Sequence, residues 1–262
     1  MPDLRDLMRP SPVVVPADTP LVVCARRLLE HPSWRMLVAI EEGGAVKGLV
    51  DDIAVFGNGV LLQEGLWFAF EPDGPDIAGT VARPAPVMSS DTPAGNALRA
   101  LRGETGVVIT EDGQVVGILT EHDLVAQAPT LLPDGRLVDE TASRPVISVP
   151  STTSARAALQ KMGDHRVRHL LVIDDELEGV VSLRDVVAGW VSPEMPLSRI
   201  LSGDPRVIPL GTSLHTAASQ MAESDIGCLP VTDRDGAVYA ILTRSDIVEV
   251  LAASSDDEEL FA

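Results

Sequence analysis

Three segments of the chain repeat a hydroxyl residue, two spacers and an aspartate at the end of an apolar run. The segments are GILTEHDL (117–124), GVVSLRDV (179–186) and AILTRSDI (240–247). A Ser or Thr at the start of a helix, with an acid three positions later, fits a capping box, in which each side chain bonds to the other residue's backbone. From the local sequence alone, helix capping is the chemistry that these pairs predict.

A fourth segment, GLVDDIAV (48–55), has the same apolar run but a different ending. Asp51 stands at the hydroxyl position, and Ala54 stands where the other copies have aspartate. Asp51 can still cap a helix, because aspartate is a preferred N-cap residue. Alanine offers no acceptor, so the sequence predicts three complete copies and one that has lost its carboxylate.

Each copy must be positioned by a longer repeat, whose helices can be recognised by their spacing. Four stretches carry apolar residues at i, i+3, i+4 and i+7, and they begin at Thr19, Thr92, Thr153 and Thr212. This spacing predicts amphipathic helices. We expect each threonine to be the N-cap, with Pro20 and Pro93 at the first helical position.

Strands complete the repeat on either side of each helix. Apolar runs follow the helices at 36–40, 106–110, 169–173 and 228–232, and turns such as Asp112-Gly113 separate them from a second strand. Acid and glycine between two strands predict a hairpin rather than a metal site. Extended segments, such as 12–16 and 145–150, precede the helices. The unit is strand–helix–strand–strand–helix, and the predicted fold class is α/β (α+β).

Composition and charge exclude several classes of function. The chain has 262 residues, of which 45% are hydrophobic and 3% aromatic, and a net charge of −19. This charge argues against nucleic-acid and anionic-membrane partners. The two cysteines, Cys24 and Cys228, lie in apolar patterns and predict buried thiols in a reducing compartment. The sequence shows no signal peptide and no long apolar run, so we expect a soluble cytoplasmic protein.

The repeat, with its proline-flanked first strand and terminal [ST]-x-x-D, resembles the CBS (cystathionine β-synthase) domain. In that family repeats pair into Bateman modules, and the resemblance implies two of them in tandem. The first module would span 1–128, with repeats 1–55 and 80–128 around an insertion, 56–79. A linker, 129–136, would precede the second module at 137–252, with repeats 137–190 and 196–252, and an acidic tail, 253–262.

The resemblance also gives the aspartates a second role. In the family, the aspartate accepts hydrogen bonds from both ribose hydroxyls of an adenosine ligand, and the first two strands of the partner repeat hold the adenine. The best cleft would contain Thr243, Arg244 and Asp246 opposite Ala142, Pro145, Ile147, Val167, Arg168 and His169. Arginine suits phosphate because its planar fork matches phosphate oxygens.

Two further clefts follow from the same matching. One would contain Ser182, Arg184 and Asp185 opposite Arg206, Val207, Ile226 and Gly227. The other would contain Thr120 and Asp123 opposite Met8, Val13, Trp34 and Arg35. Trp34 fits both base stacking and a partly buried core position. The fourth cleft, at Asp51 and Ala54, would bind no ribose.

The resemblance implies a stand-alone regulatory sensor that binds AMP, ADP or ATP and signals to an unknown protein partner, as a homodimer. The alternative is a ligand-free scaffold or oligomerisation module with vestigial clefts. We expect no enzyme activity, no metal site and no tightly bound cofactor, since no catalytic motif appears. The insertion 56–79 fits a modified linker helix or a partner surface, and the tail fits a disordered end or a docking motif at Leu260-Phe261.

Overall fold

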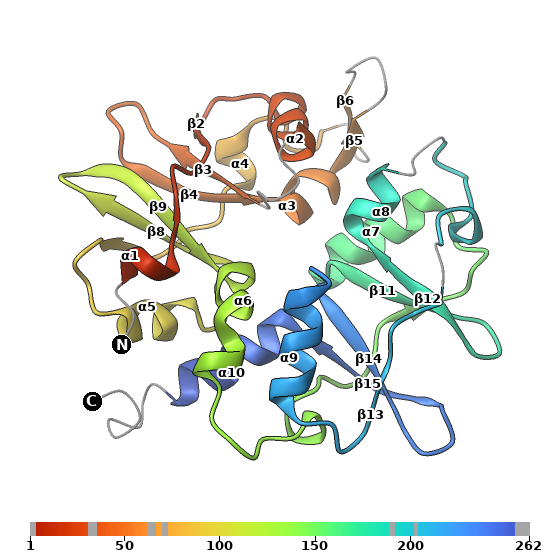
Figure 1. The fold of residues 1–262 in the computed structure, drawn as a ribbon. Helices are drawn as coiled ribbons and strands as arrows, with labels where there is room; N and C mark the ends of the chain where they lie inside the picture. Colours follow the sequence, from red (N-terminus) through yellow and green to blue (C-terminus); the bar gives the residue numbers. More distant parts are fainter. Residues whose placement is uncertain are drawn as a thin grey trace. The chain divides into compact units, whose positions relative to one another are not determined.

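The computed structural model describes residues 4–30, 36–61, 67–69, 73–188, 192–201 and 204–254. It confirms the mixed α/β fold. The described chain passes four times through the order strand, helix, strand, strand, helix, and each passage can be followed in Figure 1.

The four repeats share these five elements. Repeat one contains β2 (Val14–Pro16), α2 (Leu21–Glu30), β3 (Met36–Ile40), β4 (Val46–Asp51) and α3 (Asp52–Phe56). Repeat two contains β7 (Val87–Ser89), α5 (Ala94–Leu101), β8 (Gly106–Glu111), β9 (Gln114–Thr120) and α6 (Glu121–Leu131). Repeat three contains β10 (Ser148–Val149), α7 (Ala155–His165), β11 (His169–Ile173), β12 (Leu177–Ser182) and α8 (Leu183–Ala188). Repeat four contains β13 (Ile208–Pro209), α9 (Leu214–Glu223), β14 (Cys228–Thr232), β15 (Val238–Thr243) and α10 (Arg244–Ser254).

The sheet of every repeat has the same register pattern. The first strand runs parallel to the second, as in the pairing of Val14 with Val38, and the second and third strands form an antiparallel hairpin. Each hairpin has a register shift near its turn, for example between Ile109 and Thr110. The turn after β8 holds Asp112 and Gly113 at positive φ, so the predicted hairpins are confirmed.

The predicted threonine N-caps are wrong by one residue. The N-cap of α7 is Ser154 and that of α9 is Ser213, and both side chains accept a backbone N–H of the first turn. The threonines instead close the turn before the helix, since the Thr153 N–H bonds to the Pro150 carbonyl at 3.0 Å. Pro93 is the N-cap of α5 rather than its first helical residue. The serine side chain competes better for the cap because it reaches the free N–H groups of the helix.

The insertion at 56–79 contains a hairpin rather than the linker helix that we expected. β5 (Gly59–Leu61) pairs antiparallel with β6 (Trp67–Ala69), and the short helix α4 (Ala78–Val81) follows. Phe56, at the start of the insertion, ends α3 and is 2% exposed. Its other aromatic residues, and most of the tail, lie outside the residues whose side chains are described.

The segment that leads into each repeat packs on its neighbour in the chain. β1 (Arg9–Pro10), ahead of repeat one, pairs with β9 of repeat two, and Arg83, ahead of repeat two, bridges to Leu49 of repeat one. Ser143, ahead of repeat three, bridges to Ile241 of repeat four. The segment ahead of repeat four also contacts the first turn of α7 in repeat three, where the Ala155 N–H bonds to the Met195 carbonyl at 2.8 Å. Two single-turn 3₁₀ helices lie in these segments, at Val138–Glu140 and Leu197–Arg199.

Two compact units divide the chain. Unit 1 comprises 1–11, 85–146 and 205–262, and unit 2 comprises 12–84 and 147–204. Unit 1 therefore holds the bodies of repeats two and four, and unit 2 those of repeats one and three. These units do not follow the two chain halves, and the grouping of repeats one with two and three with four stays a prediction.

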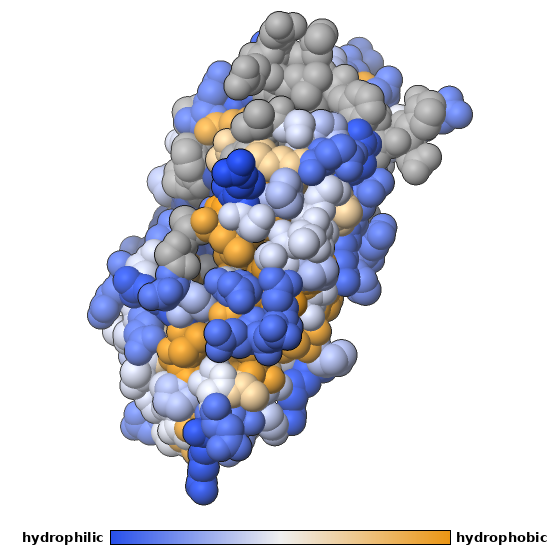
Figure 2. Space-filling model, turned by 90° about the vertical axis from the view of Figure 1, so that its right-hand side faces the viewer, coloured by the Kyte–Doolittle hydropathy of each residue, from blue (hydrophilic) through white to orange (hydrophobic). Residues whose placement is uncertain are grey.

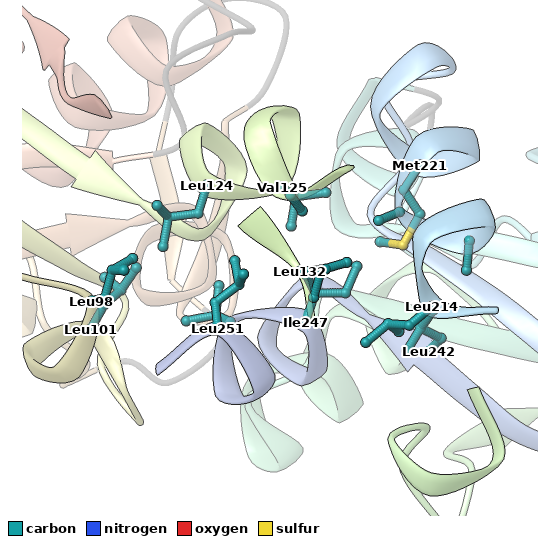
Figure 3. Close-up of a cluster of buried hydrophobic side chains, with 14 of the residues drawn as sticks. Leu98, Leu101, Leu124, Val125, Leu132, Leu214, Met221, Leu242, Ile247 and Leu251 are labelled. Carbon is teal, nitrogen blue, oxygen red and sulfur yellow. The ribbon is translucent and has the colours of Figure 1, made fainter. Parts of the chain in front are cut away.

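Each unit has its own hydrophobic core. In unit 1, Figure 3 shows side chains of α5, α6, α9 and α10 pointing toward one another, among them Leu98, Leu124, Met221 and Leu251. In unit 2, α2, α3 and α7 contribute residues that include Leu28, Phe56 and Met162. Burial of one such side chain stabilises the fold by roughly 1.5–3 kcal/mol. On the face drawn in Figure 2, hydrophilic residues predominate, in keeping with the net charge of −19.

Candidate ligand-binding site

The three complete copies of the motif form capping boxes. In each, one carboxylate oxygen, Oδ2, accepts a hydrogen bond from the hydroxyl of the Ser or Thr at 2.6 Å. The same oxygen accepts the backbone N–H of that residue, at 3.0 Å in Thr120, 2.8 Å in Ser182 and 2.7 Å in Thr243. The helix start therefore occupies Oδ2 and leaves Oδ1 for another partner.

The partner of Oδ1 differs between the two copies of unit 1. Oδ1 of Asp246 accepts the Ser143 hydroxyl at 2.5 Å. Oδ1 of Asp123 instead accepts Nη2 of Arg9 at 2.7 Å, in an ion pair whose side chains are 22% and 10% exposed. Sequence reasoning missed both partners, because neither lies near its aspartate in the chain.

The incomplete copy retains its cap, as predicted. Oδ1 of Asp51 accepts the Ala54 N–H at 2.7 Å, so alanine occupies the motif's last position without disturbing the helix start. Asp51 and Asp52 are both 2% exposed. Two buried carboxylates next to each other need cationic partners, because an unpaired buried charge is strongly destabilising.

Arginines from repeat three supply these cations within unit 2. Arg168 donates through Nε to Asp52 Oδ1 at 2.8 Å and through Nη2 to Asp51 Oδ2 at 3.2 Å. Nε of Arg184 lies 3.9 Å from Asp52 Oδ2. We expected both arginines to hold ligand phosphate, and the structure places both beside protein carboxylates. No sequence signal links Asp52 to Arg168, since the two belong to different repeats.

Arg244, the third arginine expected at phosphate, is 6% exposed. Its Nη2 lies 3.0 Å from Oδ1 of Asp225, a residue in the left-handed conformation in the loop after α9. Nδ1 of His122, from repeat two, lies 3.4 Å from the same oxygen. Asp225 was also missed by sequence reasoning, because an exposed loop aspartate carries no distinguishing pattern.

The remaining predicted residues divide between the two units. Ala142, Pro145, Val207, Ile226, Gly227 and Met8 lie in unit 1, and Val13, Ile147, Val167, His169, Ser182 and Asp185 lie in unit 2. Val207 is 42% exposed, which is unusual for a valine and leaves its side chain open to contact. Trp34 and Arg35 lie outside the described residues.

Comparison with known proteins gives the family. The CBS domain model matches the chain over residues 4–56, 76–129, 138–192 and 197–253. The chain belongs to the CBS domain family. The resemblance drawn from the motif is thereby confirmed, and the three capping boxes and the Asp51 cap begin the last helices of the four CBS repeats.

Several CBS proteins are similar to this chain. A CBS domain-containing protein of Dictyostelium discoideum is 26% identical over 131 residues, which cover 44% of this chain and 90% of that protein. The uncharacterized protein MJ1225 of Methanocaldococcus jannaschii is 21% identical over 161 residues, which cover 55% of this chain but only 58% of that protein.

Solved structures agree with the CBS fold. The crystal structure of MJ1225, described as a candidate archaeal homologue of γ-AMPK, matches with a TM-score of 0.78 at 16% identity, over 95% of this chain and 99% of that chain. An uncharacterized conserved protein of Pyrococcus horikoshii matches with a TM-score of 0.64 at 20% identity, over 94% of this chain and 97% of that chain. At these identities the likeness concerns the fold alone.

Two features are absent from the part of the chain that the structure describes. Among them, no group of three or more His, Cys, Asp or Glu side chains is arranged to hold a metal ion. No helix within the described ranges combines the length and the apolar character that crossing a bilayer requires.

Proposed function

We propose that this protein is a regulatory CBS protein that binds an adenosine-containing ligand, with Thr243 and Asp246 at its principal site. The observation that carries the proposal is the geometry of Asp246. Its Oδ2 completes the helix cap, while its Oδ1 accepts a hydrogen bond from a neutral group, the Ser143 hydroxyl, at 2.5 Å. The carboxylate therefore keeps its charge available to a ligand diol, whose hydroxyls are stronger donors toward a charged acceptor than toward a neutral one.

Neighbouring residues of unit 1 support a ligand at this place. Ser143 and Pro145 are exposed, and Ala142 is half-buried, so the segment beside Asp246 is accessible. A hydroxyl that can rotate gives up its bond to Asp246 and remakes it with a ligand oxygen. Ala142 and Pro145 are the proposed further lining within unit 1, as the family resemblance implies.

The other two copies are weaker candidates for the same ligand. Oδ2 of Asp185 is engaged in the cap, as in Asp246. Asp185 is exposed, whereas Asp246 is half-buried, so solvent screens the charge of Asp185 more strongly. Asp123 is already paired with Arg9. We propose AMP, ADP or ATP as regulatory ligands, bound reversibly rather than as a resident cofactor.

We also propose that repeats one and two form one Bateman module and repeats three and four another. The exchange of leading segments supports this grouping, since Arg9 joins repeat two and Ser143 joins repeat four. Ligand occupancy would be transmitted to a protein partner through the packing of these modules, in a homodimer. The proposed role is regulatory and not catalytic.

A scaffold without ligands is the second candidate function, and one observation favours it. Three arginines expected at phosphate, Arg168, Arg184 and Arg244, lie beside protein carboxylates. If those pairs are permanent, these three arginines are not available to a nucleotide phosphate, and the repeats serve only assembly.

Thermal unfolding with a panel of ligands separates the two candidates. The panel is AMP, ADP, ATP, NAD and S-adenosylmethionine, each at a concentration series into the millimolar range. A ligand at 100 times its Kd stabilises the native state by about 2.7 kcal/mol, which raises the melting temperature by several degrees. A rise with one or more adenosine compounds, absent with guanosine and cytidine nucleotides, supports the sensor. If no adenosine compound of the panel raises the melting temperature, the result supports the scaffold.

A further inference from the structure

The residue that contacts Oδ1 of the motif aspartate occupies the same place in two repeats of unit 1. Arg9 pairs with Ile118 of β9, and Ser143 bridges to Ile241 at the corresponding position of β15. Ile118 and Ile241 each stand two residues before the motif threonine. The two contacts are therefore versions of one position, occupied by a cation in one repeat and by a hydroxyl in the other.

The two side chains leave their aspartates in different electrostatic states. The Arg9 guanidinium lies 2.7 Å from Asp123 Oδ1, in a pair of which the carboxylate is only 10% exposed. Charge-assisted hydrogen bonds of this kind are roughly twice as strong as neutral ones, and partial burial reduces screening by solvent. Since Oδ2 of Asp123 is held by Thr120 at 2.6 Å, both of its oxygens are engaged. A ligand diol would have to displace a cation to reach Asp123.

At Asp246 a ligand diol has to displace only the Ser143 hydroxyl, which costs much less free energy than displacing a cation. Ser143 brings one neutral donor, and it is exposed, so water replaces its bond readily. The threonine and the aspartate of the two copies make the same contact, since Thr243 bonds to Asp246 at 2.6 Å as Thr120 does to Asp123. The difference in ligand access thus rests on the side chain at the Arg9 and Ser143 position.

We propose that this position decides which copy of the motif in unit 1 accepts a vicinal diol: Ser143 admits it at Asp246, and Arg9 excludes it at Asp123. Arg9 acts as a built-in occupant of the ribose acceptor. This inference rests on the proposed function for the class of ligand, a ribosyl compound, but it makes its own prediction for the repeat-two copy.

The test exchanges the two side chains and uses calorimetric titration with AMP as the probe. Arg9→Ser should add about one binding equivalent per chain over the wild type. Ser143→Arg should remove the Asp246 equivalent or weaken it at least tenfold, because a cation then occupies Oδ1. Arg9→Lys retains the charge and should leave the wild-type stoichiometry unchanged. Arg9→Ser combined with Asp123→Ala should lose the added equivalent.

The outcomes for this inference and for the proposed function are separable. If Arg9→Ser gains no equivalent, the inference is overturned, whether or not the wild type binds AMP. If the wild type binds nothing but Arg9→Ser binds one equivalent that Asp123→Ala removes, the exclusion by Arg9 stands, while the admission by Ser143 and the proposed site at Asp246 both fail. If Arg9→Lys gains the same binding equivalent as Arg9→Ser, the inference is also overturned. The loss of the arginine's packing, rather than the loss of its charge, would then explain the added binding. Circular dichroism melts of all variants establish that each is folded.

Discussion

At the scale of single residues, one carboxylate oxygen completes a helix cap in each complete motif and leaves the other oxygen for a different partner. Oδ2 of Asp123, Asp185 and Asp246 completes a helix cap, while Oδ1 of Asp123 and of Asp246 accepts from a different residue. Capping and ligand binding are therefore compatible uses of one side chain. In the incomplete motif the carboxylates of Asp51 and Asp52 turn instead to arginines of repeat three.

Removal of a buried carboxylate in unit 2 is expected to lower the free energy of unfolding strongly. Asp52→Ala should lower the free energy of unfolding by about 3–5 kcal/mol, because it leaves Arg168 and Arg184 short of a partner at a buried place. Urea unfolding measures the change. Glu41→Ala is the matched control, since it breaks the exposed ion pair of Glu41 with Lys47 at 2.8 Å, where about 0–1 kcal/mol is expected. Equal losses in the two variants would contradict the role given to Asp52.

We expect the Cys24 thiol not to react with thiol reagents in the native protein. Its side chain is fully buried, and desolvation raises its pKa from 9.0 to about 11, so it stays protonated at neutral and mildly alkaline pH. With a thiol reagent at pH 8 we expect no labelling of Cys24 until the protein is unfolded in guanidinium chloride. Mass spectrometry of the labelled peptides identifies the site, and rapid native labelling of Cys24 would show that the helix α2 core opens.

At the scale of elements, the segment that precedes a repeat packs against the last strand of the neighbouring repeat. A Cβ atom on Gly48 would lie 2.1 Å from the Arg83 carbonyl oxygen, which is backbone and cannot turn aside. At the matching position, a Cβ on Gly179 would meet only the end of the Leu201 side chain, at 2.6 Å, and repeat four already has Ala240 there.

Gly48→Ala should therefore destabilise the protein by about 1–3 kcal/mol or more, as overpacking does. Gly179→Ala should cost clearly less, because Leu201 can adopt another rotamer. Chemical denaturation of both variants gives the comparison. A loss in Gly179→Ala as large as that in Gly48→Ala would show that backbone contact is not what selects glycine at 48.

The elements also show what a sequence can predict. Hairpins, amphipathic helices and the motif caps depend on residues a few positions apart, and they were predicted correctly. The N-caps were misplaced by one residue, because Thr153 and Ser154 are both good capping residues and only the turn geometry chooses between them. The hairpin of β5 and β6 was missed because its sequence resembles neither a regular strand pair nor a helix.

At the scale of the whole molecule, the ion pairs beside the motifs join distant parts of the chain. Arg9 and Asp123 are 114 positions apart, and Arg168 and Asp52 are 116 apart. No local pattern indicates such pairs, so sequence reasoning found the motif residues but not the side chains that the structure places beside them. Four internal repeats made the family recognisable, because a weak motif that recurs in phase is a strong signal.

The central claim is that Asp246 binds a ligand as well as capping its helix. Calorimetric titration of the wild type and of Asp246→Ala with AMP, ADP and ATP tests it, with melting curves of both proteins. We predict that the variant loses about 0.5–2 kcal/mol of stability and binds at least tenfold more weakly. Asp235→Ala, which alters an exposed turn residue, should change neither quantity. An unchanged affinity in Asp246→Ala, together with a lowered melting temperature, would contradict the claim and leave Asp246 as a helix cap only.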